Sequence, residues 1–179
     1  WHDEFDGDAL DGARWECPPD APRRDGWWMR KAVSLDGQGH LVMRTFREDD
    51  KLIDGCVRTR GKFEHAFGYY VARIKLHREP GHWPAFWLMG QNIGQKNWPA
   101  CGEVDILEMG MQSAIQAGLT NRRVHAGAFW DNAGSSANYG LDKDAAANLN
   151  NDYHLYKLVW TPTLMSAFLD GVQFWALDI

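Results

Sequence analysis

The sequence contains no long apolar run, no excess of basic residues and few cysteines. Its 179 positions include no stretch of eighteen apolar residues and therefore no candidate transmembrane segment. The 19 Lys and Arg against 24 Asp and Glu leave a net charge of −5, which argues against binding to a nucleic-acid backbone. The sequence has an odd number of cysteines, and no two of them form a CxxC pair: they are Cys17, Cys56 and Cys101. A disulfide framework or a cysteine-rich zinc site is therefore not expected, although one bridge stays open.

Tryptophan is abundant, and its ten residues exceed what a core of this size needs. A hydrophobic fraction of 45% and a charged fraction of 24% are those of a folded globular chain, and we predict a single domain over residues 1–179. Short alternating segments separated by Gly, Pro, Asn and Asp predict an antiparallel sandwich or barrel. The predicted strands are 40–46, 56–63, 69–76, 84–90, 103–109, 122–130, 153–160, 164–169 and 172–177.

Residues 131–152 are too many and too polar for a tight turn. Long loops in compact domains commonly form functional rims, so we predict a loop beside a substrate groove. Helical periodicity is weak throughout the sequence. Residues 142–150 are the one segment for which a short helix or turn is predicted.

The most informative segment is residues 98–109, in which three carboxylates interrupt an apolar strand. Burying a carboxylate costs several kcal/mol unless it is paired or solvated, which a purely structural strand would avoid. Glu103 and Asp105 are two positions apart and share a face, whereas Glu108 has the wrong parity. One extra residue, a β-bulge near positions 106–107, would return Glu108 to the acidic face.

With that bulge, the Cα atoms of Glu103 and Glu108 are separated by about 13 Å of strand. If both side chains lean inward, their carboxyl groups can approach to the ~5–5.5 Å that separates the two carboxyls of a retaining glycosidase. If they lean less, the carboxyl groups lie at the ~6.5–9.5 Å that is typical of an inverting enzyme. The spacing predicts two-carboxylate glycoside chemistry and leaves its stereochemistry open. Asp105, between like charges, is predicted to hold a proton and to keep Glu108 protonated. A divalent-metal site and a solvated acidic face are the alternatives, and the surrounding aromatics argue against both.

Segments along nearly the whole chain resemble glycoside hydrolase family 16, in particular its laminarinase-like branch. The most specific match is an E-x-D-x-x-E element at residues 103–108, preceded by W-P-A-x-G at residues 98–102. The supporting segments are residues 1–15, 39–44, 68–76, 81–90, 153–162 and 169–171.

The resemblance implies an all-β fold, a concanavalin A-like β-jelly-roll sandwich of two curved antiparallel sheets with a substrate groove. It implies cleavage of internal β-glycosidic bonds with retention, by Glu103 as nucleophile, Asp105 as helper and Glu108 as acid/base. Gly127 and Phe129 depart from the pattern, because many laminarinase-like members have Thr and His there. We also expect the family's usual C-terminal strands to be missing from this sequence.

Several other side chains are candidate sugar contacts. Exposed tryptophans in a groove stack on the C–H faces of sugar rings, which we predict for Trp98, Trp87 and Trp83, with a core role open for one of the last two. Arg58 would donate to sugar hydroxyls or orient the nucleophile, with an ordinary salt bridge equally open. His125, in the strand after the acids, would contact the ligand or serve a structural role.

The expected function is hydrolysis of internal β-1,3 or mixed β-1,3/1,4 linkages in a glucan such as laminarin. The alternatives are an endo-hydrolase of a galactan (agar, porphyran or carrageenan type) and a non-catalytic β-glucan-binding module. We expect a monomer that acts on a polysaccharide or oligosaccharide, with no nucleic-acid or membrane partner and no catalytic cofactor. A structural calcium ion is common in the family, and Glu4 lies in the corresponding opening segment. Polymeric substrates lie outside cells, so secretion to an extracellular or periplasmic space is expected.

Overall fold

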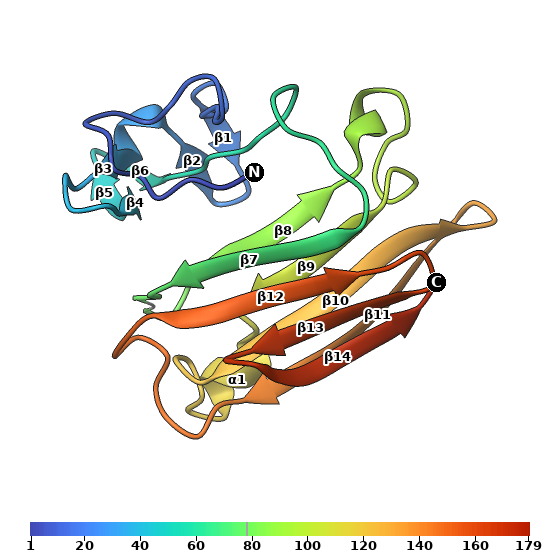
Figure 1. Ribbon diagram of the computed structural model, residues 1–179. Coiled ribbons are helices and arrows are strands. Elements are labelled where there is room, and N and C mark those ends of the chain that lie inside the picture. Colours follow the sequence, from blue (N-terminus) through green and yellow to red (C-terminus); the bar gives the residue numbers. More distant parts are fainter. Residues whose placement is uncertain (78) are drawn as a thin grey trace. The chain divides into compact units, whose positions relative to one another are not determined.

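The structure is a computed structural model that describes residues 1–77 and 79–179. Its internal contacts divide it into two compact units, Trp1–His65 and Ala66–Ile179 (Figure 1). Strands dominate both units, which confirms the predicted all-β class. Among the described residues, no helix is long and apolar enough to cross a membrane.

The first unit is built on a four-stranded sheet and a separate hairpin. The order of the sheet is β1 (Ala21–Arg23), β2 (Gly26–Trp28), β6 (Lys51–Asp54) and β5 (Thr45–Glu48). In this sheet β2 and β6 are parallel, and the other pairs are antiparallel. A 3-10 turn precedes the hairpin, so that the order is η1 (Arg30–Ala32), β3 (Val33–Leu35) and β4 (Leu41–Met43).

The prediction of a strand over residues 56–63 is wrong. Arg58 makes one isolated β-bridge with Glu16, and no named strand follows it in this segment. Residues 59–62 instead form a turn, closed by a backbone hydrogen bond of 2.9 Å between its first and last residues. Gly61 has φ +67°, a left-handed conformation that ends an extended segment.

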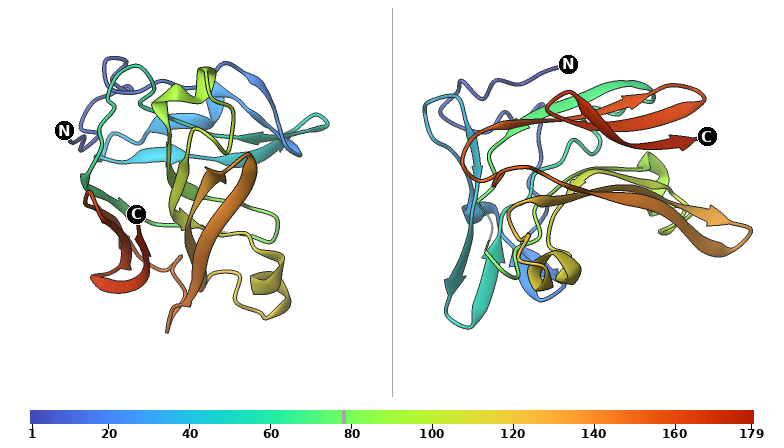
Figure 2. Two further views of the ribbon diagram at one scale, coloured as in Figure 1. Left: turned by 90° about the vertical axis from the view of Figure 1, so that its right-hand side faces the viewer. Right: turned by 90° about the horizontal axis from the view of Figure 1, so that it is seen from below.

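The second unit consists of two four-stranded antiparallel sheets that face each other (Figures 1 and 2). The first has the order β11 (Ser135–Asp144), β10 (Arg123–Asn132), β9 (Glu103–Glu108) and β8 (Ala85–Met89). The second has the order β14 (Val172–Asp178), β13 (Leu164–Leu169), β12 (His154–Trp160) and β7 (Gly68–Ile74). The short helical segments are η2 (Gln91–Gly94) and α1 (Gln112–Gln116). This arrangement confirms the predicted sandwich.

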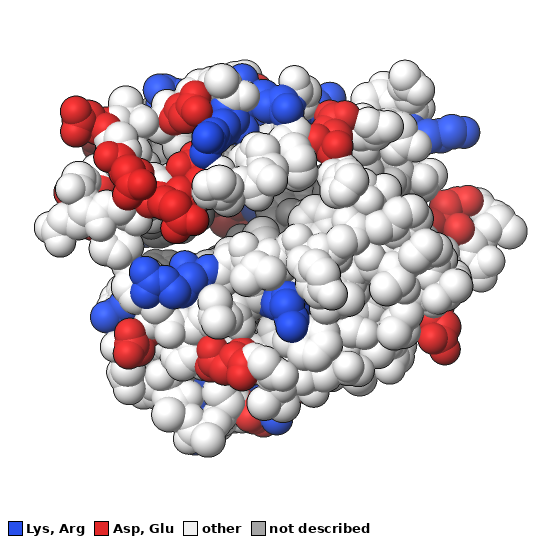
Figure 3. Space-filling model, in the orientation of Figure 1, with Lys and Arg blue, Asp and Glu red and all other residues white. Residues whose placement is uncertain are grey.

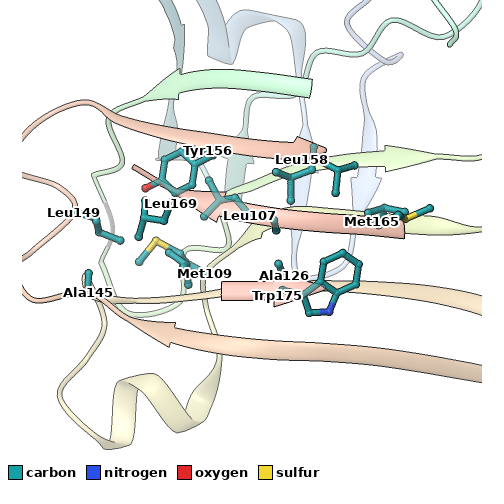
Figure 4. Close-up of a cluster of buried hydrophobic side chains, with 14 of the residues drawn as sticks. Leu107, Met109, Ala126, Ala145, Leu149, Tyr156, Leu158, Met165, Leu169 and Trp175 are labelled. Carbon is teal, nitrogen blue, oxygen red and sulfur yellow. The ribbon is translucent and has the colours of Figure 1, made fainter. Parts of the chain in front are cut away.

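The hydrophobic core of the second unit lies between its two sheets. Figure 4 shows Leu107 and Ala126 from one sheet gathered with Leu158 and Trp175 from the other, all of them 1% exposed or less. Successive side chains of a strand point to opposite faces, so every second side chain of β10 and β12 packs into this core. The other face of each sheet is thereby left to side chains that do not hold the sandwich together.

Residues 131–152 contain a strand where the sequence predicted a loop. Strands β10 and β11 pair over ten residues, and the hairpin turns at Ala133 and Gly134, both of which have positive φ. Strand β11 lies at the edge of its sheet and is largely polar, so its hydrophobic alternation is too weak for a pattern-based prediction. The helix or turn predicted over 142–150 is replaced by the end of β11 and a following turn.

The outward face of the sheet that contains β7 and β12 is largely apolar. Figure 3 shows few charged side chains over β12, β13 and β14. Tyr69 and Val71 are 75% and 52% exposed on this face, and Leu155 of β12 is also exposed. The carboxylates of the predicted site all lie on the other sheet, in β9.

Candidate active site

A β-bulge interrupts β9 at the position that the sequence predicts. On the side of β8, Asp105 and Leu107 pair with successive residues, which leaves Ile106 without a partner. On the side of β10, the register shifts at the same place. One extra residue therefore lies between Asp105 and Glu108, and the predicted bulge is confirmed.

The bulge places all three acids on the face of the sheet opposite the core, here called the carboxylate face. The core cluster takes the apolar residues of this segment, namely Val104, Ile106, Leu107 and Met109. Glu103, Asp105 and Glu108 occupy the remaining positions. Without the extra residue, Glu108 would point into the core, where an ionised carboxylate is strongly disfavoured.

Each outer carboxylate accepts a hydrogen bond from a tryptophan indole. Trp98 donates through Nε1 to Glu103 Oε2 at 2.5 Å, and Trp83 donates through Nε1 to Glu108 Oε1 at 2.8 Å. The two tryptophans are 48% and 50% exposed. Both lie beside the acids as predicted, but the contact that the structure shows is a polar one. Stacking of their rings on sugars stays a prediction.

A glycine two residues after the end of β9 supports the indole of Trp83. A β-carbon at Gly110 would lie 2.8 Å from two ring atoms of Trp83, and Gly110 has φ +133°, which side-chain-bearing residues rarely adopt. Any larger residue would push the ring away from this position. Gly110 is therefore required for the hydrogen bond between Trp83 and Glu108.

Asp105 is buried between the two glutamates and is only 2% exposed. Neither of its carboxyl oxygens has a hydrogen-bond partner among the described residues. Burial, together with the negative charges of Glu108 and Glu103, raises the pKa of Asp105 to about 8. A carboxyl group with this pKa carries a proton at neutral pH.

His125 lies opposite Glu108 in the register but leans toward β11. Its Nδ1 is 2.8 Å from Asp142 Oδ1. The ring packs over Gly127 and Gly140, which face each other across the two strands. A β-carbon at Gly140 would overlap the imidazole, and one at Gly127 would lie 3.0 Å from Nε2. The ring thus fills the space that a side chain such as Thr at position 127 would need.

The two other predicted sugar contacts lie in different units. Trp87 pairs with Asp105 in the register of β8 and β9, and its neighbours in sequence pack on the core, so it lies on the carboxylate face. Arg58 belongs to the first unit, where it donates to Glu16 through Nη2 at 2.8 Å and Nε at 3.2 Å. Of the roles left open for Arg58, the structure shows the salt bridge, and a sugar contact stays a prediction.

The described residues contain no group of three or more His, Cys, Asp or Glu side chains arranged to hold a metal ion. The acids around Glu4 do not form such a group, and a calcium ion there stays a prediction. Cys17, Cys56 and Cys101 are free thiols in the structure. Burial raises the pKa of the Cys56 thiol to about 11, so it is uncharged at neutral pH.

Sequence reasoning missed the residues that support these side chains. Gly110, Gly140 and Asp142 belong to no catalytic pattern, and only Gly110 lies close to the acids in sequence. Phe129 pairs with Glu103 across β9 and β10. In the sequence it stands out only as a departure from the family pattern, and that departure was the one available signal.

Comparison with known proteins agrees with this geometry. Residues 25–177 match the sequence pattern of glycosyl hydrolases family 16. The chain belongs to this family.

Three similar proteins illustrate the range of family 16. A glucan endo-1,3-beta-glucosidase from Cryptopygus antarcticus is 30% identical over 95% of this chain. A keratan-sulfate endo-1,4-beta-galactosidase from Sphingobacterium multivorum is 27% identical over the whole of it. A solved structure of a Bacteroides ovatus mixed linkage glucan GH16 protein, in complex with a G4G4G3G product, has a TM-score of 0.88 and 29% identity. That alignment covers 98% of this chain and 77% of the other.

The chain spans 65% of the length of the first curated relative and 46% of the second. It therefore corresponds to less than two thirds of either protein. Family membership and fold extend to the present chain, whereas the activities in the names of these relatives belong to longer proteins.

The raised pKa of Asp105 predicts that the stability of this family 16 domain falls as the pH rises. An unfolded Asp has a pKa of about 3.9, so between roughly pH 4 and pH 8 the folded state retains a proton that the unfolded state has lost. The contribution of Asp105 is fully present below that window and decreases by up to about 1.4 kcal/mol per pH unit within it. Urea unfolding from pH 5 to 8 should show a weaker decline for Asp105→Asn. Equal slopes in both proteins would contradict the protonated Asp105.

The packing of His125 over Gly127 and Gly140 leads to a second prediction. In Gly140→Ala the new methyl group displaces the imidazole, whose free end can rotate, and the contact with Asp142 is lost at a cost of about 1 kcal/mol. A crystal structure of the variant and its thermal unfolding would measure both effects. Gly12→Ala is the control, because nothing lies within 4 Å of a β-carbon there. An imidazole that remains on Asp142 would refute the steric argument.

Proposed function

We propose that the chain is a retaining endo-glycoside hydrolase that cleaves internal β-1,3 or mixed β-1,3/1,4 linkages of a glucan such as laminarin. The observation that carries the proposal is the carboxylate face of β9. There Glu103 and Glu108 flank a buried, protonated Asp105, and each accepts an indole N–H. Two carboxyl groups with separate environments are what glycoside hydrolysis requires.

In the first step, Glu103 attacks the anomeric carbon, and a bond forms between that carbon and a carboxylate oxygen. The glycosidic C–O bond breaks, and Glu108 gives its proton to the departing oxygen. In the second step, Glu108 takes a proton from water, the water oxygen bonds to the anomeric carbon, and Glu103 leaves as a carboxylate. Every proton in this sequence is supplied or accepted by Glu108.

Asp105 is the helper in this scheme. It lies between the two glutamates with its proton at neutral pH, so only the outer carboxyls change their charge with each step. Because Asp105 is neutral, no third negative charge lies between Glu103 and Glu108. A charge there would make the ionisation of either glutamate less favourable. The proposed steps use carboxyl groups alone.

A neutral glucan fits the charge of the chain better than a sulfated galactan does. Three arginines that could hold sulfate groups are engaged elsewhere. Arg58 binds Glu16, Arg123 binds Asp144, and Arg122 donates to a backbone carbonyl. The net charge of −5 also disfavours a polyanionic substrate. The endo-galactosidase among the relatives keeps a galactan as the second candidate. We further propose a secreted monomer, since glucan polymers lie outside cells.

Release of reducing ends from laminarin, lichenan and agarose tests the substrate. We expect activity on laminarin or lichenan and less than about 1% of that rate on agarose. The size of the early products separates internal from terminal cleavage, and proton NMR of the first product gives the anomeric configuration. A preference for agarose, or inversion at the anomeric carbon, would overturn the proposal.

Variants of the two glutamates test the assignment of roles. Glu103→Gln should lower turnover by more than about a thousandfold, because no nucleophile remains, while oligosaccharide affinity changes only a few-fold. Glu108→Gln should be rescued by substrates with activated leaving groups, which need no protonation. Trp130→Phe, a substitution on the core face of β10, is the matched control. Turnover by Glu103→Gln at the wild-type rate would exclude it as the nucleophile.

A further inference from the structure

The nucleophile position has an aromatic neighbour that the proposed mechanism does not use. Phe129 of β10 pairs directly with Glu103 of β9 and lies on the carboxylate face. Its ring packs against that of Trp98, with centroids 5.8 Å apart and planes tilted by 48°. Trp98 in turn donates to Glu103. Trp98 thus contacts both Phe129 and Glu103, which are themselves partners in the strand register.

The backbone of the loop that carries Trp98 is held independently of Phe129. Gly90 at the end of β8 donates its N–H to the carbonyl of Gly102 at 3.0 Å, and a β-carbon on Gly90 would overlap the carbonyl oxygen of Cys101. Gly102 has φ +80° and turns the chain into β9. These contacts fix where the loop begins and ends, but they do not orient the indole.

The indole of Trp98 needs a side-chain support because it is 48% exposed. A half-exposed side chain samples several rotamers unless a neighbour selects one. Phe129 is the aromatic neighbour that packs on this ring. Phenylalanine has no polar atom, so it can act on Glu103 only through the position of Trp98.

We propose that Phe129 is a positioning residue for the nucleophile, holding the Trp98 indole where its N–H donates to Glu103. The inference rests on the proposed function, in which Glu103 attacks the anomeric carbon. The hydrogen bond to Oε2 restrains the orientation of the Glu103 carboxylate that attacks the anomeric carbon. Loss of Phe129 lets the indole move, so Glu103 is correctly oriented for a smaller fraction of the time.

The assay isolates the attack by Glu103. The probe is a 2,4-dinitrophenyl 2-deoxy-2-fluoro β-gluco-oligosaccharide. A Glu103 oxygen bonds to the anomeric carbon, the bond to the aryl oxygen breaks, and dinitrophenolate leaves with the electron pair. No proton is needed, so the burst of dinitrophenolate reports attack without a contribution from Glu108.

We expect Phe129→Ala to slow trapping about tenfold at saturating probe and to change the apparent KM less than twofold. Trp98→Phe should slow trapping to a similar extent. In the double variant the losses should not multiply, because Phe129 acts through Trp98. Phe129→Tyr keeps the ring and should trap within twofold of the wild-type rate. Phe129→Leu replaces the alanine variant if thermal unfolding shows that the latter does not fold.

Two further variants separate positioning from general damage. Trp130→Phe, the neighbouring substitution on the core face, should trap at the wild-type rate. Gly12→Ala should also trap at that rate and should turn over polymeric glucan at the wild-type rate, because nothing lies within 4 Å of a β-carbon there. A structural role for Phe129 that does not act through Trp98 would give losses that multiply with those of Trp98→Phe.

The outcomes distinguish this inference from the proposed function. If Glu103→Gln traps as well as the wild type, or the wild type does not trap at all, the proposed function fails. If the wild type traps and Glu103→Gln does not, the function stands. Trapping at the wild-type rate by Phe129→Ala and Phe129→Leu would then refute the positioning role, as would multiplicative losses in the double variant.

Discussion

The site depends on one extra residue in β9. A regular strand would send Glu103 and Glu108 to opposite faces, with one acid in solvent and the other in a core of Ile, Leu and Trp side chains. The bulge at Ile106 lets two consecutive apolar residues enter the core and returns Glu108 to the face of Glu103. The same irregularity satisfies packing on one side of the sheet and chemistry on the other.

The three carboxyls are made unequal by their surroundings. Each outer acid accepts a hydrogen bond from an indole, Glu103 from Trp98 and Glu108 from Trp83. Asp105 has no hydrogen-bond partner among the described residues and is buried between two negative charges, so the ionised form is least stable there. Hydrogen bonding and burial, rather than residue type, therefore distinguish Asp105 from the two outer acids.

Strand β10, next to β9, carries the two residues beside the site that depart from the family pattern, Gly127 and Phe129. Gly127 and Gly140 leave room for the His125 ring, which leans toward Asp142. Phe129 supplies an apolar support to Trp98 where many members of the laminarinase-like branch carry a histidine. Both departures from the family pattern are thus linked to how neighbouring side chains pack.

The amino-acid sequence alone was sufficient for the all-β class, most strands, the acid triad and its bulge, because these follow from parity and hydrophobic alternation within a few residues. The polar edge strand β11 escaped prediction, since its backbone is held by pairing with β10 rather than by an apolar pattern. Tertiary structure decided the indole donors, the support of Trp83 by Gly110 and the lean of His125. Each of these contacts joins residues from different strands or loops, and its geometry exists only once the sheet register and the core packing have brought them together.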